Sequence, residues 1–159
     1  MREILVNDMQ NRLKGTKRLV ARVLRRVLRA EGIRAYALSV ALVDDARMRA
    51  LNRRFLGRRG TTDVMSFPLS GPGDRLLAGE IVASAERALA VARDRRADPR
   101  GELLLYVVHG CLHLTGYDDR TAARARDMHD RENQLLAEFG YAEAYGSGRR
   151  RRKPTRKDT

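Results

Sequence analysis

The segment DPRGELLLYVVHGCLHLTGYDD, which runs from Asp98 to Asp119, has the pattern of a helix that lies inside a protein core. Between Leu103 and Leu112 it is apolar on nearly every side, as expected of a helix that is covered all round. The Asp-Pro pair at its start can cap the first turn and fill the first helical position. Gly116 can end the helix, because glycine adopts the left-handed backbone conformation found at helix ends.

The same segment contains three side chains that can bind one metal ion. His109 and His113 are four residues apart, so a helix places both imidazoles on one face. A turn at Gly116 can carry Asp119 to the open side of the histidines, which gives two nitrogen ligands, one oxygen ligand and a fourth position for water. That is the pattern of a catalytic zinc site. Asp118 is an alternative third ligand, although its offset fits the pattern less well.

Two other interpretations of this pattern stay open. The histidines can be ordinary side chains of a buried helix, with Asp119 capping the next one, although buried imidazoles need polar partners or a metal. The spacing also resembles that of metzincin proteases, in which a glutamate that acts as general base follows the first histidine. Gly110 stands at that position here. The chain therefore lacks the group that activates water in those proteases, which favours a different substrate for hydrolysis.

Residues Val108 to Asp119 closely resemble the signature of the YbeY family of bacterial endoribonucleases, which act in ribosomal RNA maturation. The resemblance covers most of residues 38–140, because other blocks similar to that family stand upstream in the same order and at similar distances: Leu51-Asn52 with Gly57, Thr62 to Pro68, and Gly79 to Ile81. It implies a single-domain α/β metalloprotein that acts on single-stranded RNA. It also implies one zinc ion per chain, held by His109, His113 and Asp119.

The chain departs from the family pattern at two positions. Asp119 stands where many members have a third histidine, and a carboxylate is also a zinc ligand in proteins. Leu56 stands where well-studied members have an arginine, and a hydrocarbon cannot offer phosphate the planar set of donors of a guanidinium. Arg54, Arg58 and Arg59 are close enough in sequence to serve as RNA-binding residues instead. The alternative is that they form a solvated loop.

The sequence supplies four weaker catalytic candidates, of which two stand in the block from Thr62 to Pro68. Asp63 and Ser66 are expected on a strand beside the cleft, unless they only make hydrogen bonds at a turn or strand end. Arg58 and Arg59 are candidates for stabilising the charge that gathers on phosphate. The protein partner of the metal-bound water is otherwise unassigned.

The composition indicates one basic globular domain followed by a charged tail. With 159 residues and 43% hydrophobic content, the chain can bury a core without disulfides. Its net charge of +13 favours a polyanionic partner, either nucleic acid or an anionic membrane surface. We expect the YbeY-like domain over residues 1–145 and a disordered tail over 146–159, which holds +6 of that charge. The tail should bind RNA through Arg149, Arg150, Arg151, Arg152 and Lys153.

Cysteine usage and hydropathy favour the cytoplasm. Cys111 is the one cysteine of the chain, and its place in the apolar helix favours a packing role. No apolar run has the length of a membrane span, and the N-terminal residues lack the apolar stretch of a secretory signal. We therefore expect a soluble cytoplasmic protein without membrane contact.

Hydrophobic periodicity predicts an α/β layered fold, with a small mixed sheet packed with several helices and the metal site at the end of a buried helix. Strands are expected at 3–7, 37–43, 62–67 and 76–83, the last two as an antiparallel hairpin. Helices are expected at 16–30, 44–55, 84–97, 98–116 and 121–140. The first helix has an arginine-rich face that either is solvated or lies along RNA. His129 and Glu132, on the last helix, are expected to face solvent and are not assigned as ligands.

The leading hypothesis is a zinc-dependent endoribonuclease that cleaves single-stranded rRNA during small-subunit maturation or ribosome quality control. The rRNA, the small ribosomal subunit and ribosome-associated proteins are the expected partners. The nucleophile is either water or the RNA 2′-hydroxyl. One alternative, which Leu56 supports, is a non-catalytic ribosome-assembly factor with a structural metal. A second is a metal-dependent peptide hydrolase, which Gly110 argues against.

Overall fold

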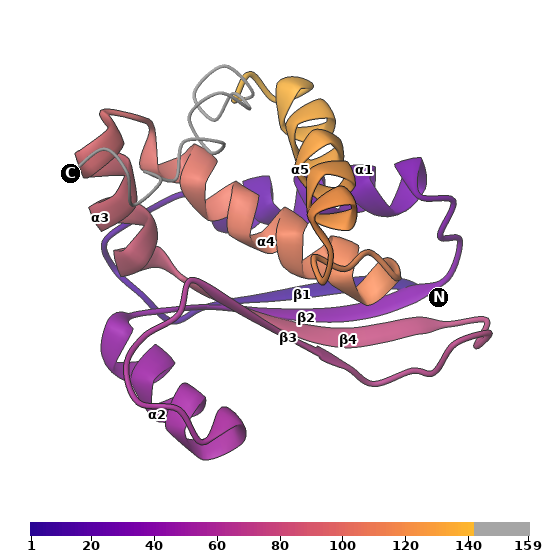
Figure 1. Cartoon of the computed structure of the whole chain (residues 1–159), viewed down its shortest axis with the longest axis horizontal. Coiled ribbons are helices and arrows are strands. Elements are labelled where there is room, and N and C mark those ends of the chain that lie inside the picture. Colours follow the sequence, from indigo (N-terminus) through magenta and orange to yellow (C-terminus); the bar gives the residue numbers. More distant parts are fainter. Residues whose placement is uncertain (142–159) are drawn as a thin grey trace.

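The structure is a computed structural model that describes residues 1–141. Within that range one sheet of four strands packs with five helices (Figure 1). The elements in chain order are β1 (Arg2–Asp8), α1 (Lys17–Ala30), β2 (Tyr36–Val43), α2 (Asp45–Leu56), β3 (Val64–Pro68), β4 (Leu77–Ser84), α3 (Ala85–Arg95), α4 (Pro99–Thr115) and α5 (Ala122–Ala137). The tail expected at 146–159, with its RNA-binding residues, lies outside the described residues.

The sheet is mixed, with the strand order β1-β2-β4-β3. β1, β2 and β4 run parallel, and β3 pairs antiparallel with β4. The last pair is the hairpin that the sequence predicted. β3 extends one residue further than expected, to Pro68, which pairs with Gly79 at the end of an edge strand, where proline is tolerated. The predicted fold class is confirmed.

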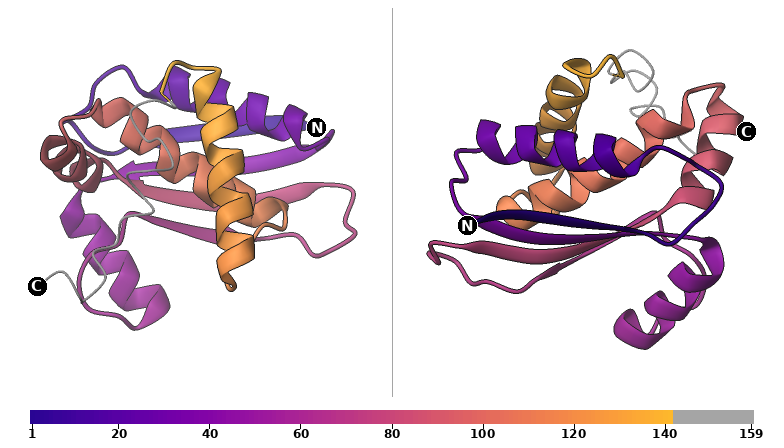
Figure 2. Two further views of the ribbon diagram at one scale, coloured as in Figure 1. Left: turned by 45° about the horizontal axis from the view of Figure 1, so that its top comes forward. Right: turned by 180° about the vertical axis from the view of Figure 1, so that it is seen from behind.

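Helices cover the two faces of the sheet unequally (Figures 1 and 2). α1, α4 and α5 lie over one face, and α2 lies against the other face at one end. The main core lies between the sheet and the first group of helices. A smaller cluster under α2 contains Val43, Met48, Met65 and Val82.

α4 is the central helix, as its sequence predicts. Residues 103–108 and 110–112 are buried, and the helix contacts α1, α3, α5, β3 and β4. Each fully buried leucine or valine contributes roughly 1.5–3 kcal/mol to the free energy of unfolding. The Asp98 side chain accepts a hydrogen bond from the backbone N–H of Arg100, which is the predicted cap. Neither α4 nor any other helix within residues 1–141 is long and apolar enough to cross a membrane.

Two glycines let the second half of α4 approach the sheet closely. A Cβ atom at Gly79 of β4 would lie 2.8 Å from Cδ1 of Leu114. A Cβ atom at Gly110 would lie 3.0 Å from Cγ2 of Ile81. Both separations are shorter than ordinary van der Waals contact. The last turns of α4, which carry the two histidines, therefore lie directly against β3 and β4.

Candidate metal centre

The last two turns of α4 place His109 and His113 side by side. Their Nε2 atoms lie 3.0 Å apart, and the rings meet edge to face with centroids 4.6 Å apart. Both side chains are partly buried, whereas residues 101–108 before them are buried. The spacing of four residues predicted this shared face.

Each imidazole is held through its Nδ1 atom. Nδ1 of His109 faces Oε1 of Glu132 at 2.5 Å, and Nδ1 of His113 faces the backbone oxygen of Tyr117 at 3.0 Å. A carbonyl and a carboxylate accept hydrogen bonds, so each Nδ1 carries the hydrogen, and Nε2 of a neutral ring then holds a lone pair. Two lone pairs directed at each other over 3.0 Å repel. The pair therefore needs a positive charge between its nitrogens, from a proton or a metal ion.

Glu132 is a residue whose role the sequence analysis missed. We expected it to face solvent, but it is 1% exposed, and its Oε2 atom also lies 3.2 Å from Nδ1 of His129. A carboxylate that bonds to Nδ1–H of a metal-ligating histidine fixes the tautomer and makes the ring a stronger ligand. A signal was present in the sequence, because Glu132 shares a helix face with Met128 and Leu136, which are buried, and a carboxylate on such a face needs a polar partner.

Asp119 completes a group of three possible ligands. One ligand atom from each of Asp119, His109 and His113 lies within 4.8 Å of the others. Ligands about 2 Å from one ion lie up to about 4 Å apart, so the three atoms are close to the spacing that one ion requires.

Asp118, the alternative third ligand, is engaged elsewhere. Its Oδ1 atom accepts from the backbone N–H of Arg120 at 3.0 Å, and its Oδ2 atom accepts from Nη1 of Arg124 at 3.1 Å. The geometry favours Asp119.

The turn after α4 directs Asp119 toward the histidines. Gly116 has a φ of +114°, a value that favours glycine because a Cβ atom would clash there. The backbone N–H groups of Gly116 and Tyr117 donate to the carbonyl oxygens of His113 and Leu112. Glycine thus ends α4 where the sequence predicted.

Side chains from α5 and from the residue that follows α1 hold this turn. The Tyr117 hydroxyl donates to Oε2 of Glu31 at 3.1 Å, and Nε of Arg131 donates to Oε1 of Glu31 at 2.6 Å. Burial and the hydrogen bond with Glu31 raise the pKa of Tyr117. The hydroxyl therefore remains a donor at neutral pH, and α1 and α5 stay connected to the candidate site.

A cleft of about 360 Å³ opens beside the histidines. The α4 residues that line it are His109, Gly110, His113 and Leu114, and the facing residues are Asp63, Val64, Ser66 and Pro68. Asp63 and Ser66 therefore both line the cleft, as expected, although Asp63 lies just before β3 and not within it. Oδ1 of Asp63 also accepts from the backbone N–H of Val64, so this residue has a strand-end role as well.

A second cavity, of about 320 Å³, adjoins the first. Val64 and Ser66 line both. Leu56, Arg58 and Arg59 line the second cavity. The two arginines that were proposed to compensate for Leu56 therefore line a cavity that shares two β3 residues with the histidine cleft.

Buried Asn52 anchors the loop that carries these arginines. Its Nδ2 atom donates to the backbone oxygen of Gly60 at 3.2 Å. Arg54, the third arginine proposed to bind RNA, lies over the ring of Phe55 at 5.3 Å and does not line either cavity.

Gly110 gives a steric reason against protease chemistry. A Cβ atom at this position would meet the side chains of Ile81 at 3.0 Å and Val64 at 3.3 Å, so a glutamate there would have to displace both side chains. The neighbouring Cys111 is fully buried, and burial raises the pKa of its thiol to about 12. The expected packing role of Cys111 fits this environment.

Comparisons with known proteins identify related sequences and a related fold. The family model for endoribonuclease YbeY matches residues 4–140. A protein named endoribonuclease YbeY from Moorella thermoacetica is 42% identical over 131 residues, which cover 75% of this chain and 83% of that protein. One of the same name from Anaeromyxobacter dehalogenans is 40% identical over 151 residues, or 92% of this chain and 76% of that protein.

A third protein of that name, from Anaeromyxobacter sp. (strain Fw109-5), is 45% identical over 104 residues, which cover 65% of this chain and 54% of that protein. The solution structure of TM1509 from Thermotoga maritima superposes with a TM-score of 0.66 at 25% identity, and the match covers 94% of each chain. The fold is therefore shared along nearly the whole chain.

Proposed function

Because this chain belongs to the YbeY endoribonuclease family, we propose that it is a zinc-dependent enzyme that cleaves phosphodiester bonds of single-stranded RNA. One observation supports a metal ion at this site. The Nε2 atoms of His109 and His113 face each other at 3.0 Å, while both Nδ1 atoms have acceptors as partners. The shared name of the relatives supports RNA as the substrate.

The donor set fits zinc. Two imidazole nitrogens and one carboxylate oxygen are ligands that zinc accepts, and three protein ligands leave one position open. Glu132 and the backbone oxygen of Tyr117 supply the outer hydrogen bonds that ligating histidines usually make. When bound, zinc lowers the pKa of a coordinated water to about 7 and polarises a phosphoryl oxygen.

The chain's own residues then position the RNA. The cleft places Asp63 and Ser66 across from the two histidines, so a phosphate held there lies between them. The Asp63 carboxylate can accept a proton from the nucleophile. Arg58 and Arg59, in the adjoining cavity, can pair with phosphate oxygens through their guanidinium groups.

We also propose that the physiological substrate is rRNA, during small-subunit maturation and ribosome quality control in the cytoplasm, with ribosome-associated proteins as partners. The net charge of +13 supports a polyanionic partner. A non-catalytic ribosome-assembly factor is the second candidate, because Leu56 lines the cavity where a guanidinium is expected. In that case the metal is structural.

Cleavage and binding of one RNA separate these candidates. Zinc-loaded wild-type protein and a His113→Ala variant are purified identically and incubated with a 5′-labelled single-stranded RNA. We expect cleavage by the wild type, loss of cleavage in the variant and similar RNA binding by both. RNA binding by the wild type without zinc-dependent cleavage favours the assembly factor.

Replacing the 2′-hydroxyl at the scissile nucleotide identifies the nucleophile, since attack by water does not need this hydroxyl.

A further inference from the structure

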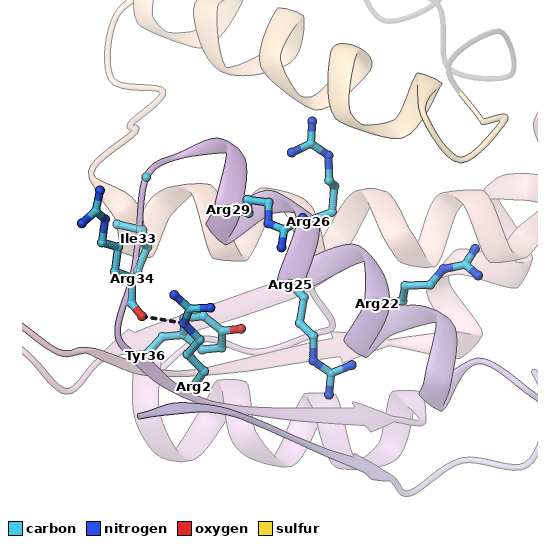
Figure 3. A pocket seen from close by; sticks show the side chains of 9 residues that line it. Arg2, Arg22, Arg25, Arg26, Arg29, Ile33, Arg34 and Tyr36 are labelled. Atoms are coloured by element: carbon cyan, nitrogen blue, oxygen red, sulfur yellow. Dashed lines mark hydrogen bonds between the residues drawn. The ribbon is translucent and has the colours of Figure 1, made fainter.

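We infer that a pocket lined by arginines, far from the histidines, binds the sugar-phosphate backbone of RNA outside the cleavage site. The inference rests on the proposed function, because it takes RNA as the substrate. The pocket has a volume of about 710 Å³ and lies where α1, β1 and the start of β2 meet (Figure 3). Six arginines line it, namely Arg2, Arg22, Arg25, Arg26, Arg29 and Arg34.

The pocket and the histidine cleft lie toward opposite edges of the sheet. β1 forms one edge and β3 the other. Arg2 of β1 lines the pocket, and Ser66 of β3 lines the cleft. Neighbouring strands are about 4.8 Å apart, so three intervals separate the edges by about 14 Å. A single phosphate group cannot reach both sites, but an RNA strand can.

The arginines of α1 form a row. Arg22, Arg25, Arg26 and Arg29 follow a spacing of three and four residues, so their side chains leave the helix on one side. The row is about 10 Å long, from the helical rise of 1.5 Å per residue. Such a row matches several phosphates along a backbone better than one small anion.

The charge of this pocket is largely uncompensated. Glu138 pairs with Arg26 at 2.6 Å, but no described residue forms an ion pair with Arg25, Arg29 or Arg34. Guanidinium groups held together in this way repel one another and attract a polyanion. Each also offers paired donors that match two phosphate oxygens.

The sheet side of the pocket is preformed. Arg2 and Tyr36 are partners in the β1–β2 register, and Nε of Arg2 donates to the backbone oxygen of Arg34 at 3.0 Å, as Figure 3 shows. Glu3, the adjacent acidic residue, alternates with Arg2 along the strand and so points to the opposite face. The carboxylate therefore does not neutralise the pocket.

The buried side of α1 argues against a membrane surface as the partner. An interfacial helix inserts its apolar face into lipid. The apolar face of α1 is buried in the core, through Val20, Val23, Leu24, Val27 and Leu28. A ligand that approaches α1 from outside therefore meets its arginines and not its apolar face.

Two matched double variants test the inference. Arg25→Ala with Arg29→Ala removes two guanidinium groups from the pocket. Arg93→Ala with Arg126→Ala removes two from exposed positions on α3 and α5 and is the control for the loss of charge. Alanine favours helices, so all four changes are compatible with folding. The full chain carries His113→Ala in each case, so that the RNA stays intact during binding.

Binding is measured by fluorescence anisotropy over a series of salt concentrations, with one long single-stranded RNA and one short RNA that fills only the cleft. We expect the pocket variant to bind the long RNA about tenfold more weakly, with a log–log salt slope smaller by about 1.4, since each lost phosphate contact on a single strand contributes about 0.7. The control variant should keep the slope, and the short RNA should bind all proteins equally.

Equal binding of the long RNA by the pocket and control variants would overturn the inference. If the pocket variant kept its RNA affinity but bound phosphatidylserine vesicles more weakly, the pocket would be assigned to lipid. If it kept its RNA affinity and instead bound only an acidic protein more weakly, the pocket would be assigned to an acidic protein surface. Either result would also overturn the inference. Cleavage of the short RNA by zinc-loaded chains that retain His113 is measured separately. Its absence contradicts the proposed function, while the binding result still decides on the pocket.

Discussion

Oε1 of Glu132 lies 2.5 Å from Nδ1 of His109, which joins a buried carboxylate of α5 to an imidazole of α4. α5 therefore belongs to the candidate metal centre although it supplies no proposed ligand. The contact fixes which nitrogen of His109 faces the cleft. It also makes the ligand strength of the imidazole depend on how α5 packs against α4.

Replacement of this carboxylate should weaken zinc binding. Glu132→Gln keeps an acceptor of the same size but removes the negative charge, and such outer-shell changes typically cost about 10–100-fold in metal affinity. Competition with a fluorescent zinc chelator measures the change in Kd. Glu138→Gln, on an exposed glutamate that follows the same helix, is the matched control and should leave zinc affinity as in the wild type. Equal zinc affinity of both variants and the wild type would count against the role of Glu132.

Two adjacent aspartates give a sharp test of the third ligand. Asp119→Ala removes a proposed ligand, so the Kd for zinc should rise by more than about tenfold. Asp118→Ala removes the acceptor of Arg124 and should leave that Kd nearly unchanged. Zinc titration of both variants by isothermal calorimetry makes the comparison. The reverse order of effects would reassign the ligand to Asp118.

Gly110 should be required for the stability of the fold. A leucine side chain there must displace Ile81 and Val64, and such overpacking costs about 1–3 kcal/mol. Urea denaturation of Gly110→Leu measures the loss in the free energy of unfolding. Ala90→Leu, at an exposed position of α3, is the control and should change it by less than about 0.5 kcal/mol. An equal free energy of unfolding for the two variants would show that the neighbouring side chains accommodate leucine without cost, which would contradict this prediction.

The surface pair of Arg26 and Glu138 should give a small, pH-dependent contribution to stability. The hydrogen bond from Arg26 lowers the pKa of Glu138. A carboxylate with a lowered pKa stabilises the fold above its unfolded pKa of about 4.3, and the contribution disappears as the pH falls through the folded pKa. Both groups are exposed, so the effect is small.

We therefore expect Glu138→Gln to melt slightly below the wild type at neutral pH, with the gap closing below about pH 4. Thermal melts of both proteins over a pH series measure this. A gap that stays constant into the acid range would exclude the pair as its cause.

Elements marked by strong local signals could be predicted from the sequence. The ends of α4 follow from an Asp-Pro cap and from Gly116, and the structure has both. The i, i+4 spacing of His109 and His113 likewise placed both rings on one face. These features depend on neighbouring residues, so no knowledge of distant contacts was needed.

Features that depend on packing between distant elements could not be predicted in this way. Glu132 is 23 residues from His109, and only the crossing of α4 and α5 brings them together. The expectation that Glu132 faces solvent was wrong because polar residues on a terminal helix were assumed to be exposed. The arginine pocket similarly needs Arg2 and Arg34 to join α1, which the helix pattern alone did not indicate.

We propose that two imidazoles and a carboxylate hold one zinc ion in a site with an open position. Anomalous X-ray scattering at the zinc edge, from crystals of protein purified without chelators, tests it most directly. We expect one peak per chain, about 2 Å from Nε2 of His109, Nε2 of His113 and an oxygen of Asp119. A crystal that shows no peak there, or that shows the three groups turned away from one another, would contradict the claim.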